Sequence, residues 1–102
     1  MARSFYKNTI GNVIKIISVL KQSENDGEVM TISKIAALTG IHKWSVSRTI
    51  DVYMSPFVEV IIPEHLEDVG LQLKIIRLKD PEITIERISN YLKAKKKISE
   101  DS

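Results

Sequence analysis

Residues 31–50 read TISKIAALTGIHKWSVSRTI and predict two short helices joined by a tight turn. Two helices that cross steeply need a small residue where they approach each other, and Ala36 provides it. The turn also needs a residue that tolerates a positive φ, and Gly40 follows four positions later. Branched apolar residues would hold the angle between the helices, and they stand at Ile35, Ile41, Val46 and Ile50.

Capping signals predict where these two helices begin and end. Ser33 can cap a helix over 34–39, and Gly40 can close it in the left-handed conformation. The second helix is expected over 43–54, because Pro56 disfavours the helical conformation in the residue before it. Its inward residues are expected to be Val46, Ile50 and Tyr53.

Upstream, residues 9–21 predict a longer amphipathic helix. Its apolar stripe consists of Ile10, Val13, Ile14, Ile17 and Leu20. Ile16 and Val19 lie off this stripe, so they belong either to additional core or to a subunit contact. The polar run 23–28 ends the helix, and residues 29–32 favour a short strand.

After residue 56 the apolar period changes from that of a helix to that of a strand. Segments 57–62 and 71–78 are rich in β-branched and large apolar residues, so we expect an antiparallel hairpin with a long loop. A final amphipathic helix is expected over 81–97, because proline is tolerated in a first helical turn.

This order of elements, with the pattern Ala36, Gly40 and Val46, resembles a winged-helix DNA-binding domain. The resemblance covers about residues 9–79 and is nearest to small transcriptional regulators of archaea and their viruses and plasmids. It implies an α+β fold, a winged helix-turn-helix, in one domain spanning residues 1–102. The implied parts are a helical core at 9–54 with its helix-turn-helix at 33–54, a wing hairpin at 57–79, and an extra C-terminal dimerisation helix at 81–97.

In that family the second helix of the motif enters the major groove and its outward residues contact bases and phosphates. The resemblance therefore implies that helix 43–54 is the recognition helix, with Arg48 able to contact guanine O6 and N7. The start of the first motif helix and the hairpin strand would contact the DNA backbone. The implied DNA-binding residues are Ser33, Lys34, His42, Lys43, Trp44, Ser45, Ser47, Arg48, Lys74 and Arg77.

Two features depart from the family pattern. His42 stands where many members have Ser or Thr, which are better helix caps. The hairpin loop carries Glu64, Glu67 and Asp68 where a DNA-gripping wing normally carries Arg or Lys, so this loop could instead contact a protein partner. Trp44 either packs against the hairpin or contacts DNA, and the sequence leaves both open.

The last helix either covers the chain's own first helix or pairs with a second subunit. We favour a homodimer, because an amphipathic helix follows the hairpin and the first helix has apolar residues on a second side. Two-fold symmetry would place two recognition helices roughly 34–36 Å apart. The candidate interface consists of Ile16, Val19, Ile85, Ile88, Tyr91 and Leu92.

Charge is unevenly distributed along the chain, although the formal net charge is only +2. Residues 31–50 contain Lys34, Lys43 and Arg48 and no acid, whereas residues 51–70 contain no Lys or Arg. The acids of that second block are Asp51, Glu59, Glu64, Glu67 and Asp68. A face that binds a polyanion is therefore expected to draw on the first half of the chain and on the basic tail, which carries the lysine cluster at 93–97.

Composition narrows the functional classes. A chain of 102 residues with no cysteine and two histidines favours a single domain without disulfides, metal or another cofactor. The sequence has no phosphate-cradling glycine motif, signal peptide or membrane-length apolar stretch, so we expect a cytoplasmic protein that is not an enzyme.

The winged-helix resemblance and the cationic segment 31–50 together lead us to expect sequence-specific binding of double-stranded DNA. The protein would act as a transcriptional repressor that occludes a promoter. Two alternatives remain at this point. One is a winged-helix module that binds proteins of the transcription or replication machinery. The other is an architectural DNA-binding protein with little sequence preference.

Overall fold

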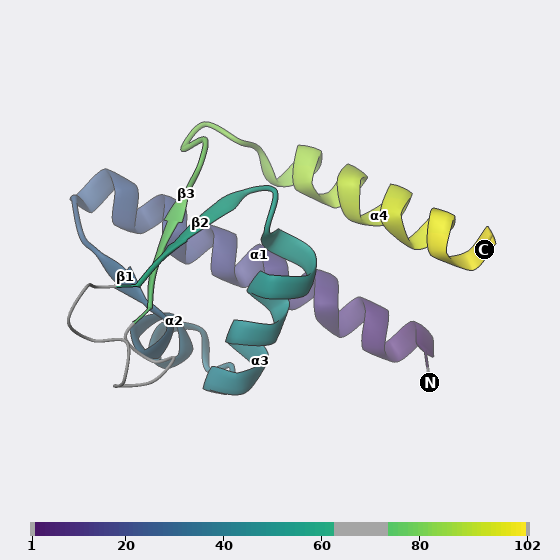
Figure 1. The fold of residues 1–102 in the computed structure, drawn as a ribbon, viewed down its shortest axis with the longest axis horizontal. Coiled ribbons are helices and arrows are strands. Elements are labelled where there is room, and N and C mark those ends of the chain that lie inside the picture. The colour runs from purple at the N-terminus through teal and green to yellow at the C-terminus, as the bar shows by residue number, and fades with distance from the viewer. Residues whose placement is uncertain (1, 63–73, 102) are drawn as a thin grey trace.

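The computed structural model describes residues 2–62 and 74–101, and the side chains over 9–62 and 74–94. Over these residues the chain has an α+β fold with four α-helices, one π-helical segment and a small sheet (Figure 1). The elements in order are α1 (Ala2–Asp26), β1 (Met30–Thr31), α2 (Ile32–Thr39), α3 (Lys43–Thr49), η1 (Ile50–Met54), β2 (Val58–Ile61), β3 (Ile75–Leu78) and α4 (Ile85–Asp101).

The sheet has three antiparallel strands in the order β1-β3-β2. Val58 pairs with Leu78 and Ile61 with Ile75, so the predicted antiparallel hairpin is confirmed. Met30 of β1 pairs with Ile76 on the other side of β3. The loop acids Glu64, Glu67 and Asp68 lie outside the described residues, as does the predicted strand start at 71–73.

Helix α1 is longer at both ends than the predicted span 9–21. The polar run after Lys21 does not end it, because Ser23 is buried and its hydroxyl donates to the carbonyl of Leu20 over 2.8 Å. The helix ends at Gly27, whose φ of 70° lets the N–H of Glu28 donate back to the carbonyl of Ser23.

The core lies where α1 meets α2, α3, β3 and α4. Because α1 packs against partners on more than one side, its buried face is wider than the predicted stripe. Val13, Ile16 and Ile17 are fully buried, whereas Ile10 and Ile14 are only half-buried. The structure thus assigns Ile16 to the core.

Helix α4 begins at Ile85, four residues later than predicted. A carboxylate oxygen of Asp80 accepts from the N–H of Glu82, which holds residues 80–83 in a turn that competes with the helix. Thr84 then caps α4, because its hydroxyl oxygen accepts from the N–H of Arg87 over 3.1 Å.

Half of the predicted dimer interface is buried within the chain itself. Ile16, Ile88 and Leu92 are buried in the core, so in this fold they do not face a second subunit. The ring of Tyr91 packs edge-to-face on Phe57 at a centroid distance of 5.1 Å. Tyr91 nevertheless remains 36% exposed, Ile85 is 37% exposed and Val19 is half-buried.

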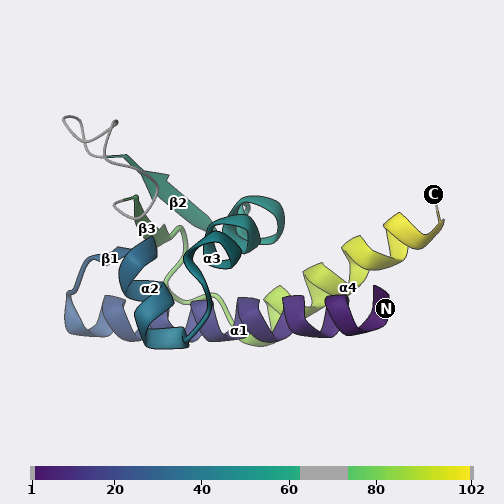
Figure 2. The same ribbon diagram turned by 90° about the horizontal axis from the view of Figure 1, so that it is seen from below.

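The two chain ends lie at the same end of the molecule, away from the sheet (Figures 1 and 2). There α4 runs alongside the N-terminal half of α1, and the two helices are in contact. Among the described residues, no helix has the length and apolar character needed to cross a membrane.

Candidate nucleic-acid interface

Helix α2 is capped by Thr31. The sequence had predicted Ser33 as the cap. The Thr31 hydroxyl oxygen accepts from the N–H of Lys34 over 3.1 Å. Pairing with β3 holds Thr31 in extended conformation, which is the backbone geometry of a helix cap. Ser33 therefore lies inside the first turn, where both it and Lys34 are exposed.

The predicted turn at Gly40 is confirmed. Gly40 has a φ of 76°, and its N–H donates to the carbonyl of Ala36 over 2.9 Å. Thr39 supports the turn in a way the sequence analysis missed. Its hydroxyl donates to the carbonyl of Ile35 and accepts from the N–H of Ile41. A threonine directly before the glycine of a helix end was the available signal.

The apolar frame predicted around the turn is also confirmed. Ile35, Val46 and Ile50 are buried, and Ala36 and Ile41 are half-buried against the same core. Since these side chains come from both helices, α2 holds α3 in a defined orientation.

His42 caps the start of α3. Its Nδ1 accepts from the N–H of Trp44 over 3.1 Å, although the sequence suggested that histidine is a weaker cap than Ser or Thr. An imidazole nitrogen that accepts carries no proton, so in this geometry the proton of the neutral ring is on Nε2. Because His42 is exposed, this second nitrogen is a donor available to a ligand.

The predicted helix over 43–54 is confirmed in its bounds, but its winding changes after Thr49. The α-helix ends at Thr49 and continues as the π-helical segment η1. A π-helix places more residues in each turn, so the next inward side chain after Ile50 comes four positions later. Met54 is accordingly fully buried, and Tyr53, the predicted inward residue, is half-buried.

The outward side of α3 is defined by its buried residues Val46 and Thr49. Trp44 and Arg48 stand one helical turn apart on the opposite side, and both are exposed. Trp44 is 71% exposed, which contradicts the alternative that it packs against the hairpin. Lys43 and Ser45 are exposed beside them, and Ser47 is half-buried.

Helices α2 and α3 lie together on one side of the molecule, the side seen in Figure 2. All the charged side chains of residues 31–50 are cationic, and Lys34, Lys43 and Arg48 are all exposed. Asp51, also exposed, is the first acid after them. We call the set Lys34, His42, Lys43, Trp44, Ser45 and Arg48 the α2–α3 face.

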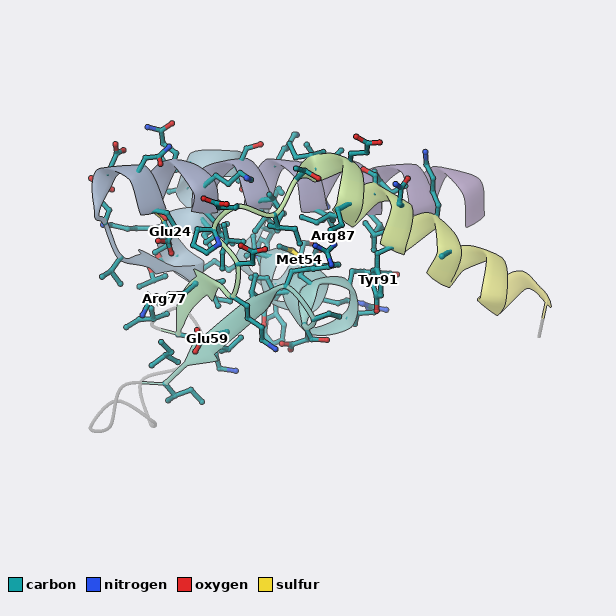
Figure 3. All side chains as sticks on the ribbon, turned by 90° about the horizontal axis from the view of Figure 1, so that it is seen from above. Glu24, Met54, Glu59, Arg77, Arg87 and Tyr91 are labelled. Atoms are coloured by element: carbon teal, nitrogen blue, oxygen red, sulfur yellow. The ribbon has the colours of Figure 1, made fainter. Side chains whose placement is uncertain are left out.

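The hairpin cations predicted to contact DNA have different surroundings. Arg77 is exposed, but its cross-strand partner is Glu59, and it lines a cavity of about 240 Å³ together with Glu24 and Glu28. Figure 3 shows Arg77 and Glu59 on the hairpin, near the end of α1 that carries Glu24. Lys74 is half-buried. Arg77 therefore belongs to an acidic neighbourhood rather than to the α2–α3 face.

Within the part of the chain that the structure describes, no three His, Cys, Asp or Glu side chains gather as a metal site.

No family model matches the chain, and comparisons with curated proteins and with solved structures find no match. The case for this interface therefore depends on the residues described above.

Proposed function

We propose that this protein is a winged helix-turn-helix DNA-binding protein that recognises a specific double-stranded sequence. In this proposal it acts in the cytoplasm as a transcriptional repressor by occluding a promoter. The observation that carries the proposal is the α2–α3 face, where exposed Lys43, Trp44 and Arg48 project from a helix held by a well-defined turn.

The chemistry of this face suits duplex DNA. An α-helix fits the major groove, and the Arg48 guanidinium can donate two hydrogen bonds to guanine O6 and N7. Lys34 and Lys43 can neutralise phosphates, and the Nε2–H of His42 and the hydroxyl of Ser45 are short-range donors to them. Because residues 31–50 contain no acid, nothing within this segment repels the DNA backbone.

The arrangement of the other elements supports the winged helix-turn-helix assignment. Helix α1 and the short strand β1 precede the α2–α3 pair. The antiparallel hairpin β2–β3 follows it, and β3 also pairs with β1. Arg77 is surrounded by acids, so we assign the main DNA contacts to α2 and α3 and not to the hairpin strands.

We include a homodimer in the proposal, with α1 and α4 as its contact region. Of the predicted interface residues, Ile85 and Tyr91 remain the most exposed, at 37% and 36%. Light scattering of the purified protein tests this, and we expect a dimer mass that Ile85→Glu lowers. A monomer mass at every concentration used for DNA binding would remove the dimer from the proposal.

The function is tested by fluorescence anisotropy of labelled duplex DNA titrated with the full-length protein. The duplexes are the region upstream of the protein's own gene and a scrambled sequence of the same composition, each at low and near-physiological salt. We expect tighter binding to the upstream region, and we expect this difference to persist at the higher salt.

Other outcomes would contradict the proposal in distinguishable ways. Equal affinities that fall together with salt would indicate the architectural, sequence-independent role. Absence of binding at both salt concentrations, by a protein shown to be folded, would leave the protein-interaction role, with the acidic loop as the first place to look for a partner.

A further inference from the structure

Trp44 is the most exposed large apolar side chain of the described residues, and it is the only tryptophan in the chain. Burying a tryptophan removes more apolar area from water than burying almost any other residue, so its exposure leaves a large favourable contribution available to binding. The other described aromatic side chains are less exposed to solvent than Trp44. Phe57 and Tyr91 pack on each other, and Tyr53 is half-buried. Trp44 is thus available to a ligand.

The position of Trp44 on α3 is well defined. Its backbone N–H donates to Nδ1 of the His42 ring, so the first turn of α3 is fixed. Arg48 follows one turn later on the same outward side. Val46, between them in sequence, is fully buried and anchors the opposite side of the helix. A ligand that contacts Arg48 in the groove therefore also meets Trp44.

We propose that Trp44 recognises a thymine in the major groove by packing its indole ring against the C5-methyl group. This inference rests on the proposed function and deepens it by naming the base. The thymine methyl is the apolar group that the base pairs present on the major-groove edge. An indole has one donor and no acceptor, so most of its surface suits an apolar contact rather than hydrogen bonding.

The spacing between Trp44 and Arg48 also sets where the thymine lies. One turn of helix rises about 5.4 Å, whereas successive bases on one strand are about 3.4 Å apart. Side chains one turn apart therefore reach positions one to two base pairs apart. The preferred site should contain a thymine within one to two base pairs of the guanine that Arg48 contacts.

The experiment first selects a preferred site from a randomised duplex library with the full-length protein. That duplex is then resynthesised with uracil replacing each thymine in turn, which removes only the methyl group. At one thymine in each half-site we expect the wild-type protein to lose about fourfold in affinity, the effect of one buried carbon group. Trp44→Ala should bind the thymine and uracil duplexes equally.

Leu38→Ala is the matched control, because Leu38 is also a large apolar side chain, 63% exposed, but it lies on α2. This variant should keep the fourfold preference for thymine. Both variants change exposed residues, so circular dichroism and urea unfolding should match those of the wild-type protein. If Leu38→Ala also removes the thymine preference, the inference is overturned.

Intrinsic fluorescence provides an independent measurement, because Trp44 is the only tryptophan. Addition of the selected duplex should protect its emission from acrylamide quenching. Unchanged quenching, or equal binding of the thymine and uracil duplexes, would overturn the inference while leaving DNA binding intact. One strand of the selected duplex is tested alone in the same way. If it protects Trp44 from quenching more strongly than the duplex does, the inference is also overturned, because the indole ring would then stack on unpaired bases. If the wild-type protein selects no duplex, the proposed function itself fails.

Discussion

Arg48 and Arg77 are both exposed arginines on regular secondary structure, yet the charges around them differ. Arg48 lies on α3 in a segment whose charged residues are all cationic. Arg77 lies on β3 opposite Glu59 and shares a cavity with Glu24 and Glu28.

This difference shows how the neighbours of a cation decide what it can bind. A phosphate that approaches Arg77 also approaches three carboxylates, which offset the attraction over distances within the Debye length of about 8–10 Å. A phosphate or guanine that approaches Arg48 meets the other cations of the α2–α3 face, with the carboxylate of Asp51 one turn away. The DNA-binding proposal therefore depends on α3, and the predictions below test that contrast.

The largest effect is expected from Gly40→Val, because this turn orients α3. A β-branched residue at a φ of 76° is strained even though the space around the position is open. We expect a loss of about 2–3 kcal/mol in the free energy of unfolding, measured by urea denaturation, and weaker DNA binding.

Gly11→Ala is the control for that substitution. Gly11 lies within α1, and an added Cβ would meet nothing within 4 Å. We expect stabilisation by about 0.5–1 kcal/mol, since alanine favours the helix. If Gly40→Val unfolds at the same urea concentration as the wild-type protein, the turn does not require glycine.

Arg48→Ala tests the contrast directly. We expect it to weaken binding to the preferred duplex by about 1–3 kcal/mol in anisotropy titrations. Arg77→Ala should change affinity by less than about twofold, because Arg77 lies on the hairpin, outside the proposed contact face. Arg87→Ala, an exposed arginine on α4, serves as a control. If the Arg77 and Arg48 variants lose affinity equally, the hairpin contributes to binding and the contrast is wrong.

Two substitutions of His42 distinguish its role as a helix cap from its proposed contact with DNA. His42→Ala removes the acceptor for the Trp44 N–H and should cost about 1 kcal/mol of folding stability in thermal or urea unfolding. His42→Asn keeps an acceptor and should retain the stability. If the Asn variant is stable but binds DNA more weakly, the Nε2–H of His42 contacts DNA. If it loses stability like the Ala variant, the cap assignment is incorrect.

Asp51→Asn is expected to have the smallest effect, and in the opposite direction. Asp51 is exposed one turn beyond Arg48, so removing its charge should raise duplex affinity about twofold at low salt. The gain should shrink as salt is raised, because added ions screen exposed charges. Glu59→Gln, on the hairpin, should show no such gain in the same titration, and an equal gain would place the DNA near both residues.

Local chemistry made much of the fold predictable from sequence. The Gly40 turn, the inward positions of Ile35, Val46 and Ile50, and the antiparallel pairing of the hairpin depend on backbone preferences and apolar spacing over a few residues. The exposed side chains of α3 followed from the same spacing, because a helix with one buried side must present the other to solvent.

The tertiary structure decided which elements lie next to each other. Ile16, Ile88 and Leu92 are buried in the core where α4 packs on α1, whereas the sequence favoured their assignment to a second subunit. Pairing of β1 with β3 makes Thr31 the cap of α2, and β3 brings Arg77 beside Glu24 of α1 and Glu28. These outcomes depend on contacts between residues far apart in the chain, and a periodic pattern carries no information about its distant partner.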